Sequence, residues 1–137
     1  MADVERTVGN IMVTSPITVK QWQPVAHARQ LMLMHSFSFL PVRIDQSWYL
    51  VSELGLAKFL GVNNETKKSR LGETIENAKV AGMEMVTIRD EDLLCTNMQV
   101  ADVLHRSLLQ NGPMLWLVVN EAHPEHLAGV LSPFELM

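Results

Sequence analysis

The residues with the clearest chemical potential stand near the end of the sequence, in the run Ser132-Pro133-Phe134-Glu135. Serine followed three positions later by glutamate, with proline at the first helical position, forms a helix capping box. Capping alone accounts for both the serine and the glutamate. Capping combined with recognition of a ligand by the glutamate carboxylate is the alternative, and the sequence leaves both open.

Other reactive side chains form no catalytic or metal-binding pattern. The histidines lack the spacing and further ligands that a zinc site needs, which favours solvated surface residues. Cys95 is the single cysteine, so an intramolecular disulfide is excluded and no neighbour indicates an activated thiolate. Asp90-Glu91-Asp92 reads as a solvated turn, and no P-loop, Rossmann or nucleophile-elbow motif occurs. We therefore predict neither an enzyme nor a metal site. The histidines are His27, His35, His105, His123 and His126.

Length and composition limit the class of protein. The chain has 137 residues, 47% hydrophobic and 19% charged, which suits one compact domain or two small modules. A net charge of −4, with basic residues gathered only at Lys67, Lys68 and Arg70, argues against a nucleic-acid partner. The longest nearly uncharged run, Ser107 to Asn120, is too short to insert into a membrane. We expect a cytoplasmic protein, because the single cysteine fits a reducing compartment and the N-terminus lacks the apolar region of a signal peptide.

The first half of the chain predicts a series of short elements. A helix is expected near Val8 to Met12, a strand at Ile17-Thr18-Val19, and a helix that begins near Pro24 and runs to His35. Two strands follow, from Phe37 to Ile44 and from Trp48 to Val51, with a turn between them. Ser52 is predicted to cap a helix from Glu53 to Leu60 that ends at Gly61.

The second half repeats this order, which indicates an internal duplication. We match Val86-Thr87-Ile88 to the strand Ile17-Thr18-Val19, and place insertions at Asp90 to Asn97 and in a longer turn at Glu121 to Leu127. The other matched elements are a helix from Met98 to Gln110, a strand from Leu115 to Val119, the strand Gly129-Val130-Leu131-Ser132, and a helix opening at Pro133. The fold class is α+β, with a first copy at 1–61, a linker and short helix at 62–80, and a second copy at 81–137 whose last helix is foreshortened.

The sequence of elements resembles a tandem pair of CBS domains, also called a Bateman module. Val8-Gly9-Asn10-Ile11-Met12, Ser15-Pro16-Ile17-Thr18-Val19, Phe39-Leu40-Pro41-Val42 and Ser52-Glu53 carry the resemblance in the first copy. The run from Leu127 to Leu136 carries it in the second. The resemblance covers nearly the whole chain and implies two β-α-β-β-α copies packed with pseudo-twofold symmetry. It also implies a sensor that requires no cofactor and binds AMP, ADP, ATP or S-adenosylmethionine.

The resemblance also implies where a nucleotide would bind. In the family an acid three residues after the helix-capping Ser or Thr holds the ribose, and Ser132 with Glu135 fits that spacing. Gly55 stands at the corresponding position after Ser52, so we expect only the cleft near Glu135 to bind nucleotide. Lys20 and Arg89 are the phosphate candidates. The expected base slot consists of Met85, Val86, Thr87, Pro113, Met114 and Leu115.

Leu31-Met32-Leu33-Met34 makes the predicted helix from Val25 to His35 apolar on both faces. Such a helix needs two partners, and core packing or a dimer contact is favoured over a flexible binding surface. We therefore expect a homodimer. The leading function is a regulatory ligand-binding module that acts on an unidentified regulated protein. The alternative is a CBS pair that no longer binds nucleotide and serves as a dimerisation or docking scaffold.

Overall fold

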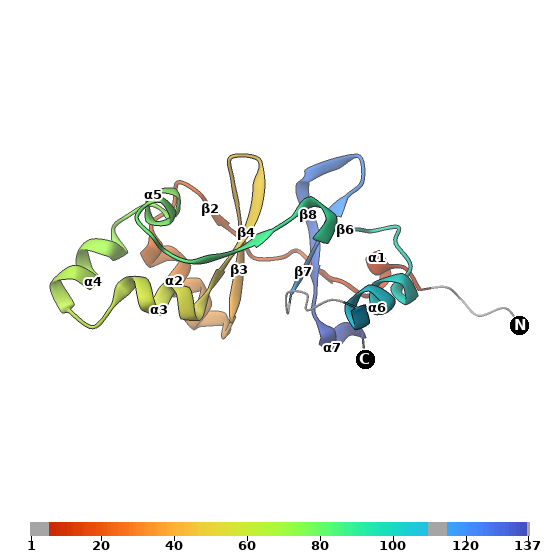
Figure 1. Ribbon diagram of the computed structural model, residues 1–137, viewed down its shortest axis with the longest axis horizontal. Coiled ribbons are helices and arrows are strands. Elements are labelled where there is room, and N and C mark those ends of the chain that lie inside the picture. The colour runs from red at the N-terminus through yellow and green to blue at the C-terminus, as the bar shows by residue number, and fades with distance from the viewer. Residues whose placement is uncertain (1–5, 110–114, 137) are drawn as a thin grey trace, which may run out of the picture. The chain divides into compact units, whose positions relative to one another are not determined.

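The computed structural model describes residues 6–109 and 115–136, and they form two compact units (Figure 1). The central unit is the continuous segment Ile17–Ile88. The terminal unit joins the N-terminal segment that ends at Pro16 to the chain from Arg89 onward. Each unit contains one four-stranded sheet. Over the described residues, no helix combines the length and apolar character needed to cross a bilayer.

The sheet of the central unit has the strand order β2-β3-β4-β5. β2 pairs in parallel with β3, and the β3–β4 and β4–β5 pairs are antiparallel. β3 and β4 form a hairpin closed by Asp45 and Gln46, both with positive φ angles. The strands are β2 (Val19–Lys20), β3 (Phe39–Ile44), β4 (Ser47–Ser52) and β5 (Met85–Ile88). The predicted strand Ile17-Thr18-Val19 is thus observed slightly later in the chain.

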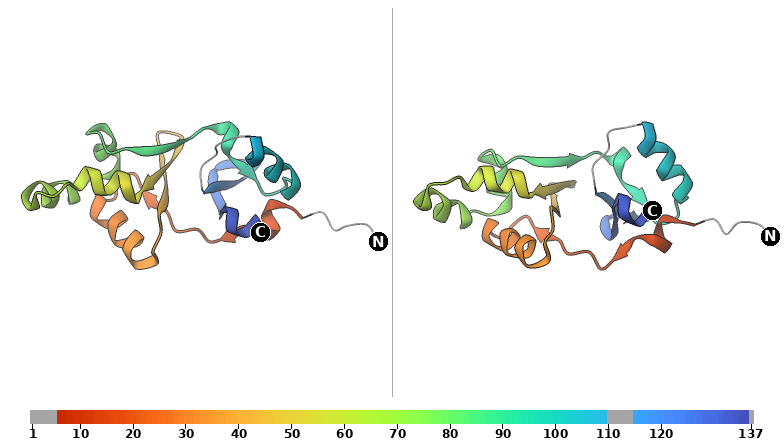
Figure 2. Two further views of the ribbon diagram at one scale, coloured as in Figure 1. Left: turned by 60° about the horizontal axis from the view of Figure 1, so that its bottom comes forward. Right: turned by 90° about the horizontal axis from the view of Figure 1, so that it is seen from below.

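Helices cover one face of this sheet, as Figures 1 and 2 show for α2 and α3. They are α2 (Val25–His35), α3 (Glu53–Leu60), α4 (Asn64–Leu71) and α5 (Ile75–Val80). Every second residue of β3 packs against them, because side chains alternate along a strand. Leu40, Val42 and Ile44 are therefore buried together with Val25 of α2 and Phe59 of α3.

The cap residues explain where three of these helices begin. The Ser52 hydroxyl accepts a hydrogen bond from Gly55 N–H at 2.9 Å, which fixes the start of α3. Asn63 and Thr74 make equivalent side-chain caps for α4 and α5. α3 ends before Gly61, whose φ of 68° suits glycine. The predicted bounds of this helix, Glu53 to Leu60, are confirmed.

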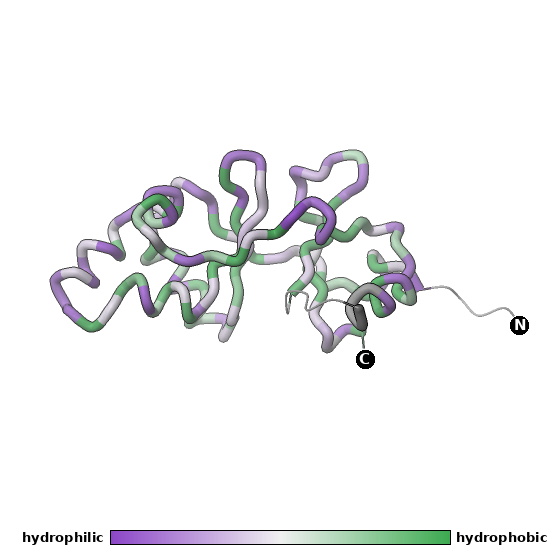
Figure 3. The backbone as a smooth tube through the Cα atoms, viewed as in Figure 1, coloured by the Kyte–Doolittle hydropathy of each residue, from purple (hydrophilic) through white to green (hydrophobic). Residues whose placement is uncertain are grey.

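α4 differs from the sequence prediction, which gave loop structure to residues 62–69. Figure 3 shows that α4 is mostly hydrophilic, and none of its residues is buried. A helix without an apolar stripe leaves no periodic signal to detect. The Asn63 cap and Arg70, whose guanidinium donates to Phe59 O and lies 5.0 Å from the Phe59 ring, hold it locally. The short helix that the sequence predicts within the linker, which Arg70 to Glu76 suggested, is instead the end of α4 and the start of α5.

The terminal unit has the same architecture with its own strands. Its sheet order is β1-β8-β7-β6, in which only the β6–β7 pair is parallel. The core includes Val8, Leu94, Val103, Val118 and Leu131, all at most 2% exposed. The elements are α1 (Val8–Ile11), β1 (Val13–Thr14), the 3₁₀ turn η1 (Asp90–Asp92), β6 (Leu94–Cys95), α6 (Val100–Leu109), β7 (Trp116–Asn120), β8 (His123–Leu131) and α7 (Pro133–Leu136).

Two sequence predictions about the second half of the chain are wrong. The predicted turn from Glu121 to Leu127 is only the pair Glu121–Ala122, because β8 already begins at His123. The polar start of β8 is exposed, so its composition resembled a loop. The match of Val86-Thr87-Ile88 to Ile17-Thr18-Val19 also fails.

Strand pairing gives the correct correspondence. β6 pairs in parallel with β7 as β2 does with β3, and β5 pairs with β4 as β1 does with β8. Residues 90–97 therefore contain η1 and β6 instead of an insertion. The β-branched run at Val86–Ile88 gave the stronger strand signal, which concealed Leu94–Cys95.

In each unit two helices start side by side, joined by a reciprocal pair of backbone hydrogen bonds. One helix of each pair, α1 or α5, precedes the antiparallel edge strand, and the other follows the parallel one. The four bonds run from Val25 N–H to Glu73 O (2.7 Å), Ile75 N–H to Gln23 O (2.9 Å), Val8 N–H to Met98 O (2.8 Å) and Val100 N–H to Arg6 O (2.9 Å). The duplication is therefore visible in hydrogen bonding as well as in topology.

Candidate functional site

The start of α7 brings together the two residues that the sequence singled out. Glu135 accepts hydrogen bonds from Ser132 N–H at 3.1 Å (Oε1) and from the Ser132 hydroxyl at 2.6 Å (Oε2). Ser132 also accepts Glu135 N–H at its carbonyl oxygen, 3.1 Å away. The glutamate arm of the capping box is thus present, with both residues half-buried.

Among the residues that the structure describes, both carboxylate oxygens of Glu135 keep acceptor capacity. An ionised carboxylate offers about four lone-pair sites, and Ser132 occupies only one on each oxygen. The arrangement therefore combines a structural cap with a fixed carboxylate that can accept two further donors. The role of Glu135 toward a ribose stays a prediction.

Leu115 lies beside Ser132 in the terminal unit, at the start of α7. Trp116 is paired with Leu131, so the residue before β7 and the residue after β8 are neighbours. Leu115 is half-buried, which suits a residue at the edge of an apolar slot. Pro113 and Met114, the other two residues predicted for this part of the slot, lie outside the described residues.

Arg89 stands just before η1, whose chain leads into β6. The parallel pairing of β6 with β7 places η1 at the end of the sheet where β7 begins. The Arg89 side chain is already engaged: Nε donates to Asp92 at 3.0 Å, and a terminal nitrogen lies 3.2 Å from Glu91. The hydrogen bond that Arg89 donates to Asp92 raises the pKa of Arg89, with smaller contributions from the charges of Asp92 and Glu91. A phosphate would have to displace these carboxylates.

Met85, Val86 and Thr87 form β5 in the central unit, where they do not share one face. Met85 pairs with Val51 and packs against the core of this unit. Val86 points to the opposite face because side chains alternate along a strand, and Thr87 is exposed. The sequence placed all three in one slot, whereas the strand separates Val86 from the other two.

Lys20 lies at the hairpin end of the central sheet. It pairs with Arg43, which pairs with Trp48, four residues before Ser52 along β4. At roughly 3.3 Å per residue this separation is about 13 Å. The structure therefore does not bring Lys20 to the start of α3, where the family's acid position lies.

Glycine occupies position 55 for a steric reason that no local sequence pattern reveals. A Cβ atom added to Gly55 would lie 2.3 Å from the carbonyl oxygen of Glu84, and 2.9 Å from the Ser52 hydroxyl. Backbone from the segment before β5 thus occupies the space that a side chain would need. No carboxylate can stand at this position unless that segment moves.

The histidines of β8 form a small polar group at its exposed end. His123 and His126 lie 3.4 Å and 3.8 Å from the Glu125 carboxylate. A backbone hydrogen bond at Glu125 lowers the pKa of this carboxyl, and the two histidine charges add to the effect. Within residues 6–109 and 115–136, no group of three or more His, Cys, Asp or Glu side chains is placed to hold a metal.

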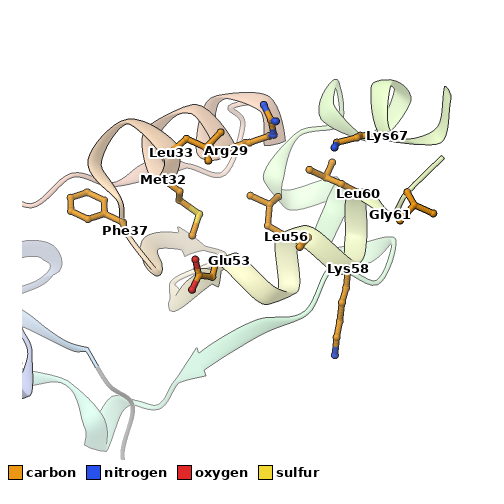
Figure 4. A pocket seen from close by; sticks show the side chains of 12 residues that line it. Arg29, Met32, Leu33, Phe37, Glu53, Leu56, Lys58, Leu60, Gly61 and Lys67 are labelled. Atoms are coloured by element: carbon orange, nitrogen blue, oxygen red, sulfur yellow. The ribbon is translucent and has the colours of Figure 1, made fainter. Parts of the chain in front are cut away.

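A groove of about 630 Å³ lies between α2, α3 and α4 in the central unit (Figure 4). No local sequence pattern predicts this groove, because the groove depends on α4, whose residues have the composition of a loop. Apolar side chains supply most of its walls. Its lining residues are Arg29, Met32, Leu33, Phe37, Glu53, Leu56, Ala57, Lys58, Leu60, Gly61, Val62 and Lys67.

No family model and no curated protein matches the chain. Solved structures do match over nearly its full length. A CBS domain-containing protein of unknown function from Bacillus anthracis has a TM-score of 0.69 and 18% identity, over 96% of this chain and 89% of its own.

Two further solved structures contain adenosine compounds. CBSX2, a protein of Arabidopsis thaliana, in complex with AMP has a TM-score of 0.65 and 21% identity, over 95% of this chain and 92% of its own. The CBS domain pair of MJ0100 in complex with 5′-methylthioadenosine and S-adenosyl-L-methionine has a TM-score of 0.64 and 17% identity, over 97% and 94% of the two chains. With its two repeated sheet-and-helix units, this chain has the fold of a tandem CBS domain pair.

Proposed function

We propose that this chain is a regulatory binding module for an adenine nucleotide or a related adenosyl ligand. The observation that carries the proposal is the half-buried Glu135 carboxylate, held by Ser132 at the start of α7 with acceptor capacity to spare. A ribose diol has two hydroxyl donors that match this capacity. The AMP complex of CBSX2 and the S-adenosylmethionine complex of MJ0100 support the ligand class.

The proposal includes one site per chain and no catalytic step. Gly55 offers no carboxylate, and the Glu84 backbone leaves no room for one. Binding can regulate a partner only if the ligand prefers one arrangement of the chain over another, and the coupling free energy equals that preference. The regulated partner is a protein that this chain alone does not identify.

Calorimetric titration with AMP, ADP, ATP and S-adenosylmethionine tests the proposal. We expect one of them to bind with one site per chain. Glu135→Gln keeps an oxygen for the Ser132 cap but loses the charge, and charge-assisted hydrogen bonds are about twice as strong as neutral ones. The affinity should fall about tenfold, the equivalent of about 1.4 kcal/mol. Glu135→Ala should lose both the cap and the binding.

Glu65→Gln is the matched control, because Glu65 is an exposed acid in the first turn of another helix. It should leave the affinity unchanged. Two equivalent sites, or equal affinity in Glu135→Gln and the parent, would contradict the role given to Glu135.

The second candidate function is a docking or dimerisation scaffold without a nucleotide. Two observations favour it: the closed position at Gly55, and the engagement of Arg89 by Glu91 and Asp92. If the parent binds none of the four compounds at millimolar concentration, the nucleotide proposal is rejected and the scaffold becomes the leading candidate function.

A further inference from the structure

The groove between α2, α3 and α4 is lined mainly by apolar side chains. Its walls are formed by Met32, Leu33, Leu56 and Leu60, together with Phe37 at one end. Leu33 is 66% exposed, although large apolar side chains of soluble proteins are usually covered when they gather in one place. Met32, Leu56 and Leu60 are only 4–5% exposed, so the apolar surface left open in the groove is supplied mainly by Leu33 and by the fully exposed Val62.

Two cations line the groove without an ionic partner. Arg29 of α2 and Lys67 of α4 take part in no salt bridge with any residue that the structure describes. Lys67 is half-buried, so part of its hydration is lost without a compensating charge. In Figure 4 both lie on the side of the groove away from Glu53.

The remaining lysine of the lining has a different environment. Lys58 points away from the groove in Figure 4 and lies 3.8 Å from Glu84. Glu53 is the one acidic residue of the lining, on the far side from Arg29 and Lys67. One side of the groove is thus cationic, and most of the remaining lining residues are apolar.

We propose that this groove binds a single-chain amphiphile with an anionic head, such as a fatty acid. The acyl chain would lie on Met32, Leu33 and Leu56, and the carboxylate would meet Arg29 and Lys67. The volume of about 630 Å³ falls within the range of about 300–1,000 Å³ that is usual for small-ligand sites. This site lies within the central unit and goes beyond the proposed nucleotide function.

A second copy of the chain is a less favourable occupant. A twofold contact places the same patch on both sides, so groove would face groove. Arg29 and Lys67 of one copy would then approach the same cations of the other, with only Glu53 to balance them. An added anion neutralises these charges, whereas a second copy doubles them.

Calorimetry of the full chain with laurate, without nucleotide and below the micellar concentration, tests the proposal. We expect one laurate per chain, and weaker binding of octanoate by about two- to fourfold for each methylene removed. Dodecyltrimethylammonium has the same chain with a cationic head, and it should bind at least tenfold more weakly than laurate.

Two sets of variants distinguish the contacts to the ligand's head group from the contacts to its acyl chain. Lys67→Gln and Arg29→Gln should each weaken laurate about three- to tenfold, while Lys58→Gln, on the outer side, should not. Leu33→Gln should weaken laurate by a similar factor, while Met34→Gln should not, because Met34 is equally exposed (64%) but does not line the groove. All these side chains are largely exposed or half-buried, so the variants should fold.

The proposal would be overturned by no laurate binding, by equal binding of the cationic amphiphile, or by an equal loss of laurate affinity in the variants and their controls. Laurate binding that weakens with rising protein concentration and dissociates a dimer would also overturn it, because the groove would then be an interface between copies. None of these results bears on nucleotide binding at Glu135.

Discussion

Gly55 is a position where a single methyl group should destabilise the central unit. In Gly55→Ala the new Cβ would lie 2.3 Å from the Glu84 carbonyl oxygen, against an ordinary contact of 3.4 Å or more. The two atoms must separate by about 1 Å. The obstacle is backbone in a segment that leads into β5, so it cannot move as a flexible side chain would.

The magnitude follows from two opposed terms. Overpacking of a filled site costs about 1–3 kcal/mol, and a backbone obstacle belongs in the upper part of that range. Replacing glycine by alanine inside a helix returns about 1 kcal/mol. We therefore expect Gly55→Ala to lower the free energy of unfolding by about 1–2 kcal/mol, which is a fall in Tm of about 4–8 °C for a chain of this size.

Urea unfolding followed by circular dichroism measures this change, with Gly72→Ala as the control. At Gly72 the nearest atom to an added Cβ is Ser69 O at 3.5 Å, and φ is −82°, so alanine fits. Gly72→Ala should be neutral, or more stable by about 0.4–1 kcal/mol. The midpoint should shift at constant m, which indicates a change of stability alone.

A Gly55→Ala protein as stable as the parent, or more stable, would refute this reasoning. It would mean that the segment before β5 yields easily, and Gly55→Asp could then create a second ribose acid. If the clash is real, Gly55→Asp should be at least as destabilised as the alanine variant and should bind no second nucleotide.

Two further predictions concern the terminal unit and the oligomeric state. In Gly129→Ala the added Cβ would lie 2.7 Å from Val13 O, so β1 should detach from β8. We expect faster amide exchange in β1 and a free energy of unfolding lower by about 1–3 kcal/mol. Unchanged amide exchange would contradict this prediction. We also predict a homodimer through the part of α2 that does not line the groove, where Met34 is 64% exposed. Sedimentation should detect it at micromolar concentration and Met34→Glu should weaken it, whereas a monomer at every concentration would reject it.

The elements that could be predicted from the sequence are those with a local signal. α3 was predicted to the residue, because Ser52 caps it, its apolar residues have helical spacing, and Gly61 ends it. The β3–β4 hairpin was predicted from its apolar runs on either side of a polar turn. α4 was not, because it has a cap at Asn63 but no apolar stripe.

The candidate site was predictable only in part, for a related reason. Ser132 and Glu135 interact within one turn of chain, so their spacing was sufficient. The position of Lys20 in the sheet could not be predicted, because the register of β2 on β3 depends on pairing between distant segments; its role toward a phosphate stays a prediction. The close approach of Glu84 to Gly55 is also a long-range contact, which no local pattern encodes.

The discontinuity of the terminal unit has a consequence for the order in which the chain is made. The central unit, Ile17–Ile88, is continuous, so all its strands are available once Ile88 has left the ribosome. β1, by contrast, finds its partner only when β8 appears, and Thr14 pairs with Gly129. At roughly 5–20 residues per second, this interval of about 115 residues lasts about 6–23 s.

During that interval the first segment of the chain has left the ribosome without the residues it packs against. Val8, which is completely buried in the finished terminal unit, would be exposed to water throughout it. The central unit can therefore fold first. The terminal unit folds last, because its C-terminal strands must pack against an N-terminal segment that was synthesised much earlier. Slow synthesis beyond Ile88 would lengthen the exposure of α1 and β1, whereas slow synthesis before it would also delay the central unit.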